Sequence, residues 1–315
     1  MTKRRLALGL LALTLLIAAP LAGGGLGGPY GPLLFWKLRV PRLLMGILVG
    51  GTLSTVGATY QLVFQNPLAT PSTIGTTAGA VLGVLFVLVI GVPASGEHLP
   101  VVVLAAFAGA LLASLAVAAL AASGRARMHD VLLGGIAVSL AAGALSTGLQ
   151  YAADMQARFA ATQWSLGYLP QVGYRGVLFV APFAATTWLT SFGLVRGLTA
   201  LASGEDLARA QGVDVPRLRV LTLGVGALGV AACVAWCGPI AFVGLLVPHL
   251  VRLLIGHAPR VLVPASAAAG AVFLVVCDTA ARLLWPGREL PVGVVTAALG
   301  APALLVLLSR RHRSA

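Results

Sequence analysis

Apolar stretches long enough to cross a membrane recur along almost the whole chain. A membrane-spanning helix needs about 20 mainly apolar residues. Such stretches begin at Leu6 and are separated by short breaks rich in glycine, proline or charge. Their two faces are both apolar, whereas strands of a membrane barrel alternate apolar and polar residues. The pattern predicts an all-α integral membrane protein of about ten transmembrane helices, at 6–22, 42–63, 74–91, 99–122, 131–152, 177–198, 219–237, 240–256, 261–284 and 291–309.

The composition agrees with a chain embedded in lipid. Hydrophobic residues make up 59% of the 315 residues, charged residues make up 9%, and the mean hydropathy is +0.98. These values exclude an ordinary soluble domain. Residues 1–315 are therefore predicted to form a single transmembrane domain. The net charge of +13 is dispersed between apolar stretches rather than gathered in a basic stripe, which argues against binding to nucleic acid.

The basic residues between the apolar stretches predict how the chain is oriented. Cytoplasmic loops of membrane proteins are enriched in lysine and arginine. With Lys3, Arg4 and Arg5 in the cytoplasm before a retained first helix, the cytoplasmic segments hold about twice as many basic residues as the outer ones. The sequence thus predicts a multi-pass protein with both termini in the cytoplasm.

The most polar stretch, residues 203–219, predicts a short amphipathic helix at the cytoplasmic face. Ser203 can cap this helix, and Glu205 and Asp206 suit the positive end of its dipole. Gly212 can end it. The alternative is a solvated loop that joins two membrane helices.

A second segment, residues 237–249, interrupts an apolar stretch. Gly238, Pro239 and Pro248 enclose a span too short to cross a membrane comfortably. Interrupted helices expose backbone groups, which membranes tolerate only where protein or a water-filled path covers them. The break is therefore expected to lie against other helices or beside a path.

A set of short motifs follows in order along nearly the whole chain. Together they resemble the permease family of ATP-driven (ABC) importers for iron siderophores, haem and vitamin B12. The motifs are 38–42 (LRVPR), 65–71 (QNPLATP), 132–137 (LLGGIA), 164–167 (WSLG), 204–206 (GED), 208–209 (AR), 218–219 (LR), 238–245 (GPIAFVGL), 248–249 (PH), 280–282 (AAR), 289–296 (ELPVGVVT) and 299–302 (LGAP).

This resemblance implies a permease subunit of ten transmembrane helices, paired with a second copy of itself around a central path. Two ATPase subunits would bind ATP and Mg²⁺ below it, and a periplasmic or lipid-anchored substrate-binding protein would dock above it. The chain itself would hold no cofactor and no metal, would not be an enzyme, and would lie among the lipids of a bacterial inner membrane. Haem, a ferric siderophore and cobalamin all stay open as the substrate.

The polar stretch matches the coupling helix of this family, in a loop over about 199–219. By resemblance, the helix docks in a cleft of the ATPase. The matching positions are Gly204, Glu205, Asp206, Ala208, Arg209 and Gly212. A rigid amphipathic helix suits that role because it can pass an ATP-driven movement to the membrane helices attached to it.

Three arginines match positions where the vitamin B12 permease contacts acidic residues of its binding protein. They are Arg39, Arg42 and Arg282, and the predicted topology places all three at the outer face. Arginine suits such contacts because its planar group binds a carboxylate through two hydrogen bonds. Outer arginines that only extend to the lipid interface are the alternative.

Asn66 and Leu68 match residues at the cytoplasmic gate of the vitamin B12 permease. Pro67 and Pro71 would keep the preceding helix from continuing, so this turn could rearrange. A simple helix-ending turn is the alternative. Met128 and His129 fall near the second gate segment by a looser alignment.

An ion-coupled secondary transporter is the main alternative function. Such transporters place ionisable residues in mid-membrane, and the acidic candidate, Asp278, lies toward the outer end of its predicted helix. The chain lacks the Gly-x-x-x-x-Gly-Lys-Ser/Thr loop of an ATPase and the His-Glu-x-x-His motif of a membrane protease. Cys233, Cys237 and Cys277 lie in apolar stretches and are expected to be small buried residues.

Overall fold

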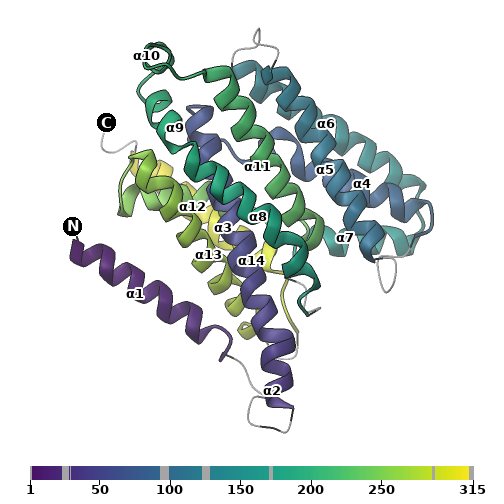
Figure 1. Ribbon diagram of the computed structural model, residues 1–315. Helices are drawn as coiled ribbons and strands as arrows, with labels where there is room; N and C mark the ends of the chain where they lie inside the picture. Colours follow the sequence, from purple (N-terminus) through teal and green to yellow (C-terminus); the bar gives the residue numbers. More distant parts are fainter. Residues whose placement is uncertain are drawn as a thin grey trace.

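The computed structural model describes residues 2–22, 28, 30–92, 99–122, 128–169, 173–285 and 288–311, and every regular element in these ranges is a helix. The longer helices are α1 (Thr2–Ala18), α3 (Val40–Val63), α4 (Thr76–Val89), α5 (Leu99–Ala122), α6 (Met128–Ala152), α8 (Arg175–Gly193), α11 (Val215–Cys237), α13 (Pro259–Leu283) and α14 (Val292–Arg311). The shorter elements are α2 (Gly31–Leu34), the π-helix η1 (Phe35–Arg39), the 3₁₀-helix η2 (Pro71–Ile74), α7 (Met155–Ser165), α9 (Val195–Ala202), α10 (Glu205–Ala210) and α12 (Val243–Leu254). Figure 1 shows one bundle, with α10 and α2 at opposite ends.

Each predicted membrane segment overlaps a helix, and the segment 99–122 coincides with α5. Within the described ranges, six helical stretches are long and apolar enough to cross a membrane. Four shorter apolar helices accompany them: Gly9–Ala18, Thr76–Val89, Val243–Leu254 and Val292–Val306. The all-α fold is confirmed, and the number of ten crossings stays a prediction.

Among the elements that differ from the expectation are α7 and the helix predicted at 177–198. Helix α7 was not predicted, because polar residues such as Gln156, Arg158 and Gln163 keep its short sequence below the apolar length of a membrane span. The predicted helix at 177–198 is divided, since α8 ends at Gly193 and α9 begins at Val195. The second piece leads directly into α10.

Helix α3 is the centre of the bundle. It packs against α13, α8, α12 and α11, and its residues from Val49 to Gln61 are buried. Gly50 of α3 faces Gly270 of α13, and a side chain on either glycine would collide with the backbone of the other. Small residues at such crossings allow membrane helices to approach closely, which maximises van der Waals contact.

Helix α6 lies at the edge of the bundle, where it packs against α4 and α5 (Figure 1). Large apolar side chains are exposed along it, namely Leu133, Ile136, Leu140 and Leu145. A continuous apolar surface of this kind is expected to face lipid or another protein chain.

Candidate functional site

The predicted cytoplasmic helix is present as α10, which connects α9 to α11. Its N-cap is Gly204, with a φ of 121°, and not Ser203 as predicted. The hydroxyl of Ser203 donates instead to the carbonyl of Thr199. Gly204 is favoured there because the reversal of the chain requires a backbone angle that other residues rarely adopt. Glu205 and Asp206 lie in the first turn, as predicted.

The C-terminal end of α10 is a Schellman motif. Gly212 has a φ of 80°, and its N–H donates to the carbonyl of Arg209 at 2.9 Å. The N–H of Val213 donates to the carbonyl of Ala208 at 3.0 Å. These two bonds satisfy carbonyls that the helix leaves open, and the left-handed residue is usually glycine. The predicted stop at Gly212 is confirmed.

Glu205 connects α10 to the next membrane helix. Its carboxylate forms ion pairs with Arg209 at 2.6 Å and with Arg219 of α11 at 2.7 Å. The hydrogen bond from Arg219, with the charges of both arginines, holds the pKa of the Glu205 carboxyl below its ordinary value of 4.5. Asp206, Leu207 and Arg209 are exposed on the outer side of α10. The helix thus has a fixed inner side and an accessible outer side.

The inner side of α10 rests on a small apolar cluster, called here the coupling cluster. It is separate from the main core of the bundle and joins α3, α9, α10 and α11. Its buried members are Val63, Leu198, Ala200, Leu201, Ala208, Val215 and Leu218. Ala208 is fully buried in it. A displacement of α10 would therefore push directly against α3, α9 and α11, because close-packed side chains move together.

The predicted gate segment follows the end of α3. The side chain of Asn66 accepts a hydrogen bond from the N–H of Leu68 at 2.9 Å, which closes a tight turn. Leu68 is 49% exposed. Thr70 and Thr73 then form a reciprocal capping box at the start of η2. Residues 65–70, called here the gate loop, therefore form an ordered turn between α3 and η2.

The predicted break is confirmed at Gly238 and Pro239, since α11 ends at Cys237 and α12 begins at Val243, whereas Pro248 lies inside α12 and does not interrupt it. Phe242 has a φ of 66°, which is rare for a bulky residue. Its ring lies over Gly300 of α14, where a side chain would collide with it. The break also borders a cavity of about 350 Å³, whose lining includes Leu68 and Thr70 of the gate loop. One side of the break is covered by protein and the other faces this cavity, as expected.

Met128 and His129, the weaker gate candidates, lie at the start of α6. His129 is exposed, and the side chain of Met128 lies outside the described residues. Helix α6 approaches η2 at Gly135, where an added side chain would meet the backbone of Thr73. This approach is almost two helical turns beyond His129. The gate role of this pair stays a prediction.

Arg42, one of the three predicted docking arginines, is buried in an ion cluster within the chain. Its guanidinium donates to both carboxylate oxygens of Asp278 on α13, at 2.8 to 3.0 Å. Its remaining nitrogen pairs with Glu289 at 2.7 Å. The Arg42 side chain is 9% exposed, that of Asp278 7% and that of Glu289 49%. Sequence analysis missed both pairs because 236 and 247 positions separate the partners.

Arg39 and Arg282 lie beside this cluster and are partly buried. Arg282 is 3.4 Å from the carboxylate of Asp278, and it donates to the carbonyls of Ala19 and Ala22 after α1. Arg39 donates to the carbonyl of Pro20 at 2.9 Å. Together these bonds attach the segment that follows α1 to η1 and α13. The three arginines are therefore neighbours, as the predicted topology requires, and their docking role stays a prediction.

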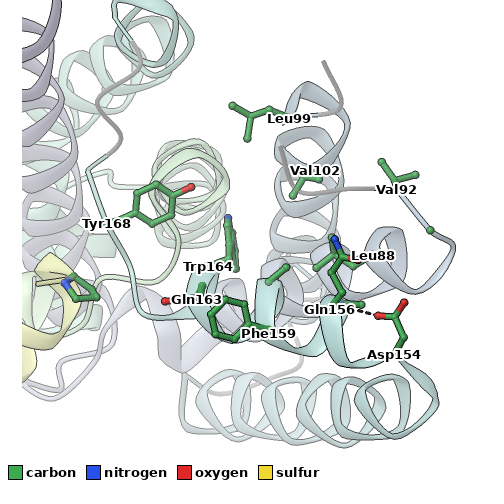
Figure 2. Close-up of a pocket in the computed structure, with 14 residues that line it drawn as sticks. Leu88, Val92, Leu99, Val102, Asp154, Gln156, Phe159, Gln163, Trp164 and Tyr168 are labelled. Carbon is green, nitrogen blue, oxygen red and sulfur yellow. Dashed lines mark hydrogen bonds between the residues drawn. The ribbon is translucent and has the colours of Figure 1, made fainter. Parts of the chain in front are cut away.

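A further hollow lies beside α7, the helix that the sequence did not predict. Figure 2 shows Trp164, Phe159 and Gln163 of α7 on one side of it, with Leu99 and Val102 of α5 opposite. Its volume is about 590 Å³. Asp154 caps α7 by accepting a hydrogen bond from the N–H of Ala157 at 2.7 Å, drawn as a dashed line in Figure 2. In Figure 1 α7 lies at the end of the bundle away from α10.

The comparison with protein families decides what kind of protein this is. The model of the FecCD transport family matches residues 13–310, nearly the whole chain. This chain belongs to the FecCD transport family. It is accordingly a multi-pass transport permease, and its all-helical fold agrees with that membership.

Two relatives of this FecCD chain carry specific names. The cobalamin import system permease protein BtuC of Halobacterium salinarum is 39% identical over 308 residues, covering 96% of this chain and 79% of the relative. The hemin transport system permease protein HmuU of Yersinia pestis is 34% identical over 281 residues, covering 88% of this chain and 83% of the relative.

A solved structure shares the fold of the FecCD chain. It is described as an inward-facing conformation of a metal-chelate type ABC transporter, with a TM-score of 0.87 and 28% sequence identity. The match covers 98% of this chain and all of the other. The resemblance stated from the sequence motifs is thereby confirmed.

Proposed function

We propose that this chain is the membrane-spanning permease of an ABC importer that carries a bulky metal chelate into the cytoplasm. The observation that carries the proposal is how α10 is packed and held against the other helices. This short helix begins at a chain reversal at Gly204 and ends in a Schellman motif, is fixed on its inner side by ion pairs and the coupling cluster, and is exposed on its outer side. Such a helix can receive a force from a partner and move the attached membrane helices as rigid bodies.

The partner at α10 is proposed to be an ATPase subunit. Leu207, 49% exposed, presents an apolar side chain between the charged Asp206 and Arg209. An apolar centre with a charged rim is the usual composition of a protein interface. ATP and Mg²⁺ would bind to that partner, and α10 with both termini would lie on the cytoplasmic side of a bacterial inner membrane.

A second copy of the chain is the proposed neighbour in the membrane, with lipid around the pair. The exposed apolar residues of α6 support this arrangement, because α6 packs against α4, α5 and η2 and still leaves large apolar side chains from Leu133 to Leu145 exposed. Two copies facing each other would enclose a central path between them. Haem, a ferric siderophore and cobalamin are the proposed substrate classes, since the relatives named above carry hemin and cobalamin in their names.

The outer end of the bundle is the proposed docking surface for a periplasmic or lipid-anchored substrate-binding protein. Arg39 and Arg282 are the proposed contacts to its acidic residues, since both are only partly buried. Arg42 is enclosed by Asp278 and Glu289. Its proposed contribution is to hold the outer ends of α3 and α13 in the correct place for docking.

The buried ion cluster also weakens the alternative of an ion-coupled secondary transporter. A coupling residue must bind and release its ion during each cycle. The carboxylate of Asp278 instead accepts three hydrogen bonds from Arg42 and lies near Arg282. The Asp278 carboxylate is therefore held in a structural ion pair and is not available to bind and release a coupling ion.

The experiment that tests the function is transport into liposomes. The permease is reconstituted with an ATPase subunit and a binding protein from the same organism, and uptake of haem, ferric siderophores and cobalamin is compared. We expect ATP-dependent uptake of one of them and its loss in Leu207→Asp, which places a charge in the proposed interface. Arg217→Ala is the matched control, because Arg217 is 84% exposed and lies outside α10. Uptake driven by an ion gradient without the ATPase would refute the proposal.

A further inference from the structure

Gln65, the second residue after the end of α3, adopts an unusual backbone conformation. Its φ is 49°, in the left-handed region. The N–H of Gln65 donates to the carbonyl of Leu62 and that of Asn66 to the carbonyl of Gln61, so Gln65 holds the left-handed position of a Schellman motif. Glycine normally occupies this position because it adopts the angle without a steric cost. Strain retained at one residue suggests that its side chain has a use.

The side chain of Gln65 reaches the segment that carries the coupling helix. Its amide nitrogen Nε2 donates to the carbonyl of Leu201, in the last turn of α9, at 3.2 Å. The same carbonyl accepts the N–H of Gly204, the N-cap of α10, at 3.1 Å. One carbonyl therefore receives a bond from the gate loop and a bond from the start of the coupling helix.

The contact is reinforced by packing directly beneath it. Val63, at the end of α3, is 1% exposed and belongs to the coupling cluster with Leu201 and Ala208. The end of α3 is thus attached to α9 and α10 at two points, one polar and one apolar. Two separate attachments restrain rotation as well as separation, and close-packed groups move together.

From this geometry we propose that Gln65 is a positioning residue that passes the movement of α10 to the gate loop. The proposal rests on the permease function proposed above and adds a specific contact to it. A force on α10 moves α9, and the bond at Leu201 makes Gln65 follow. Asn66 and Leu68 come next in the chain and form the hydrogen-bonded turn of the gate loop, so that turn is displaced too.

Four substitutions separate this role from a purely structural one. Gln65→Gly relieves the backbone strain and keeps the helix end, but deletes the side-chain bond. Gln65→Glu keeps the size and shape and removes the donor, since a carboxylate can only accept. Gln65→Lys restores a donor on a long side chain. Gln65→Ala removes the bond and keeps the strain.

The readout is the number of ATP molecules hydrolysed for each substrate molecule imported by the reconstituted transporter. We expect Gln65→Gly and Gln65→Glu to raise this ratio about three- to tenfold, the change that one ordinary hydrogen bond makes in an equilibrium. Gln65→Lys is expected to restore the ratio to within about twofold of the wild type. Thermal unfolding should show that Gln65→Gly is at least as stable as the wild type.

Each other outcome has a defined meaning. A wild-type ratio in both Gln65→Gly and Gln65→Glu overturns the inference and leaves the permease function intact. If the ratio of ATP hydrolysed to substrate imported rises in Gln65→Ala but not in Gln65→Gly or Gln65→Glu, the inference is also overturned. Backbone strain, and not the lost hydrogen bond to Leu201, would then be the cause. If the wild-type transporter imports nothing with ATP, the permease function itself fails, which is a different result.

Discussion

Removal of Asp278 is expected to destabilise the protein far more than removal of Glu289, although both carboxylates bind Arg42. The distances to the guanidinium are almost equal, 2.8 Å and 2.7 Å. The environments differ, because the side chain of Asp278 is 7% exposed and that of Glu289 is 49% exposed. Burial rather than distance should therefore decide the cost.

The magnitudes follow from what each substitution leaves behind. Asp278→Ala leaves the buried guanidinium of Arg42 without its main partner, and breaking a buried pair in this way costs about 3–5 kcal/mol. Glu289→Gln removes an exposed partner, for which about 0–1 kcal/mol is typical. The double variant Arg42→Met with Asp278→Leu removes both buried charges and should recover most of the loss.

The assay is equilibrium unfolding of the purified protein in mixed micelles, followed by loss of helical circular dichroism. Equal losses for Asp278→Ala and Glu289→Gln would refute the argument from burial. A double variant less stable than Asp278→Ala would refute the claim that the unpaired charge is the cause. Glu289→Gln also serves as the matched control, since it changes a carboxylate bound to the same guanidinium.

Three further predictions concern the helix crossings and α10. Gly50→Ala should destabilise the protein by about 1–3 kcal/mol in the same unfolding titration, because the new methyl group would press on the backbone of α13. The control is Gly224→Ala, which should be neutral or stabilising because a methyl group added at Gly224 of α11 would have no atom of another element within 4 Å. Equal losses of stability in the two variants would contradict the prediction. Gly212→Ala forces an alanine into a φ of 80°, so the Schellman end of α10 should weaken by about 1–2 kcal/mol and amide exchange in α10 should accelerate; unchanged exchange would contradict it. The pKa of Glu205 is lowered in the folded state, so its ion pairs stabilise α10 fully above pH 4.5, the ordinary value, and less as the pH falls through the lowered pKa. The protection of the α10 amides, measured as their exchange rate relative to an unfolded chain at the same pH, should fall on acidification in the wild type and much less in Glu205→Gln. The same fall in both proteins would show that another group is responsible.

Local features of the chain predicted α10 well. Its acidic first turn and its glycine stop are encoded within a few neighbouring residues, and the structure has both. The predicted N-cap, Ser203, was wrong by one residue. The chain reverses at Gly204, which has a positive φ, and Ser203 stays bonded to Thr199 at the end of α9. Propensity favours serine at such a position, but the geometry of the reversal favours glycine.

The contacts of the arginines could not be predicted from neighbouring residues in the sequence. The motif around Arg42 suggested an outward-facing contact, and the predicted topology places Arg42 at the outer end of the bundle, which stays a prediction. Its partners could not be found in the sequence, because Asp278 and Glu289 come from distant segments that meet Arg42 only after α3 and α13 pack. Sequence separation contains no information about which charges a helix crossing brings together.

By itself, the sequence determined that this protein is a helical membrane protein, where its main helices lie, and which short segments end or interrupt them. These properties depend on apolar length, on glycine and proline, and on charge near helix ends, all of which act within a few residues. Only the tertiary structure decided that Arg42 is buried against Asp278, that α7 borders a hollow, and that Gln65 bonds to Leu201. Those contacts depend on how closely helices approach each other, as Gly50 and Gly270 allow, and close packing fixes such distances only when the whole bundle has formed.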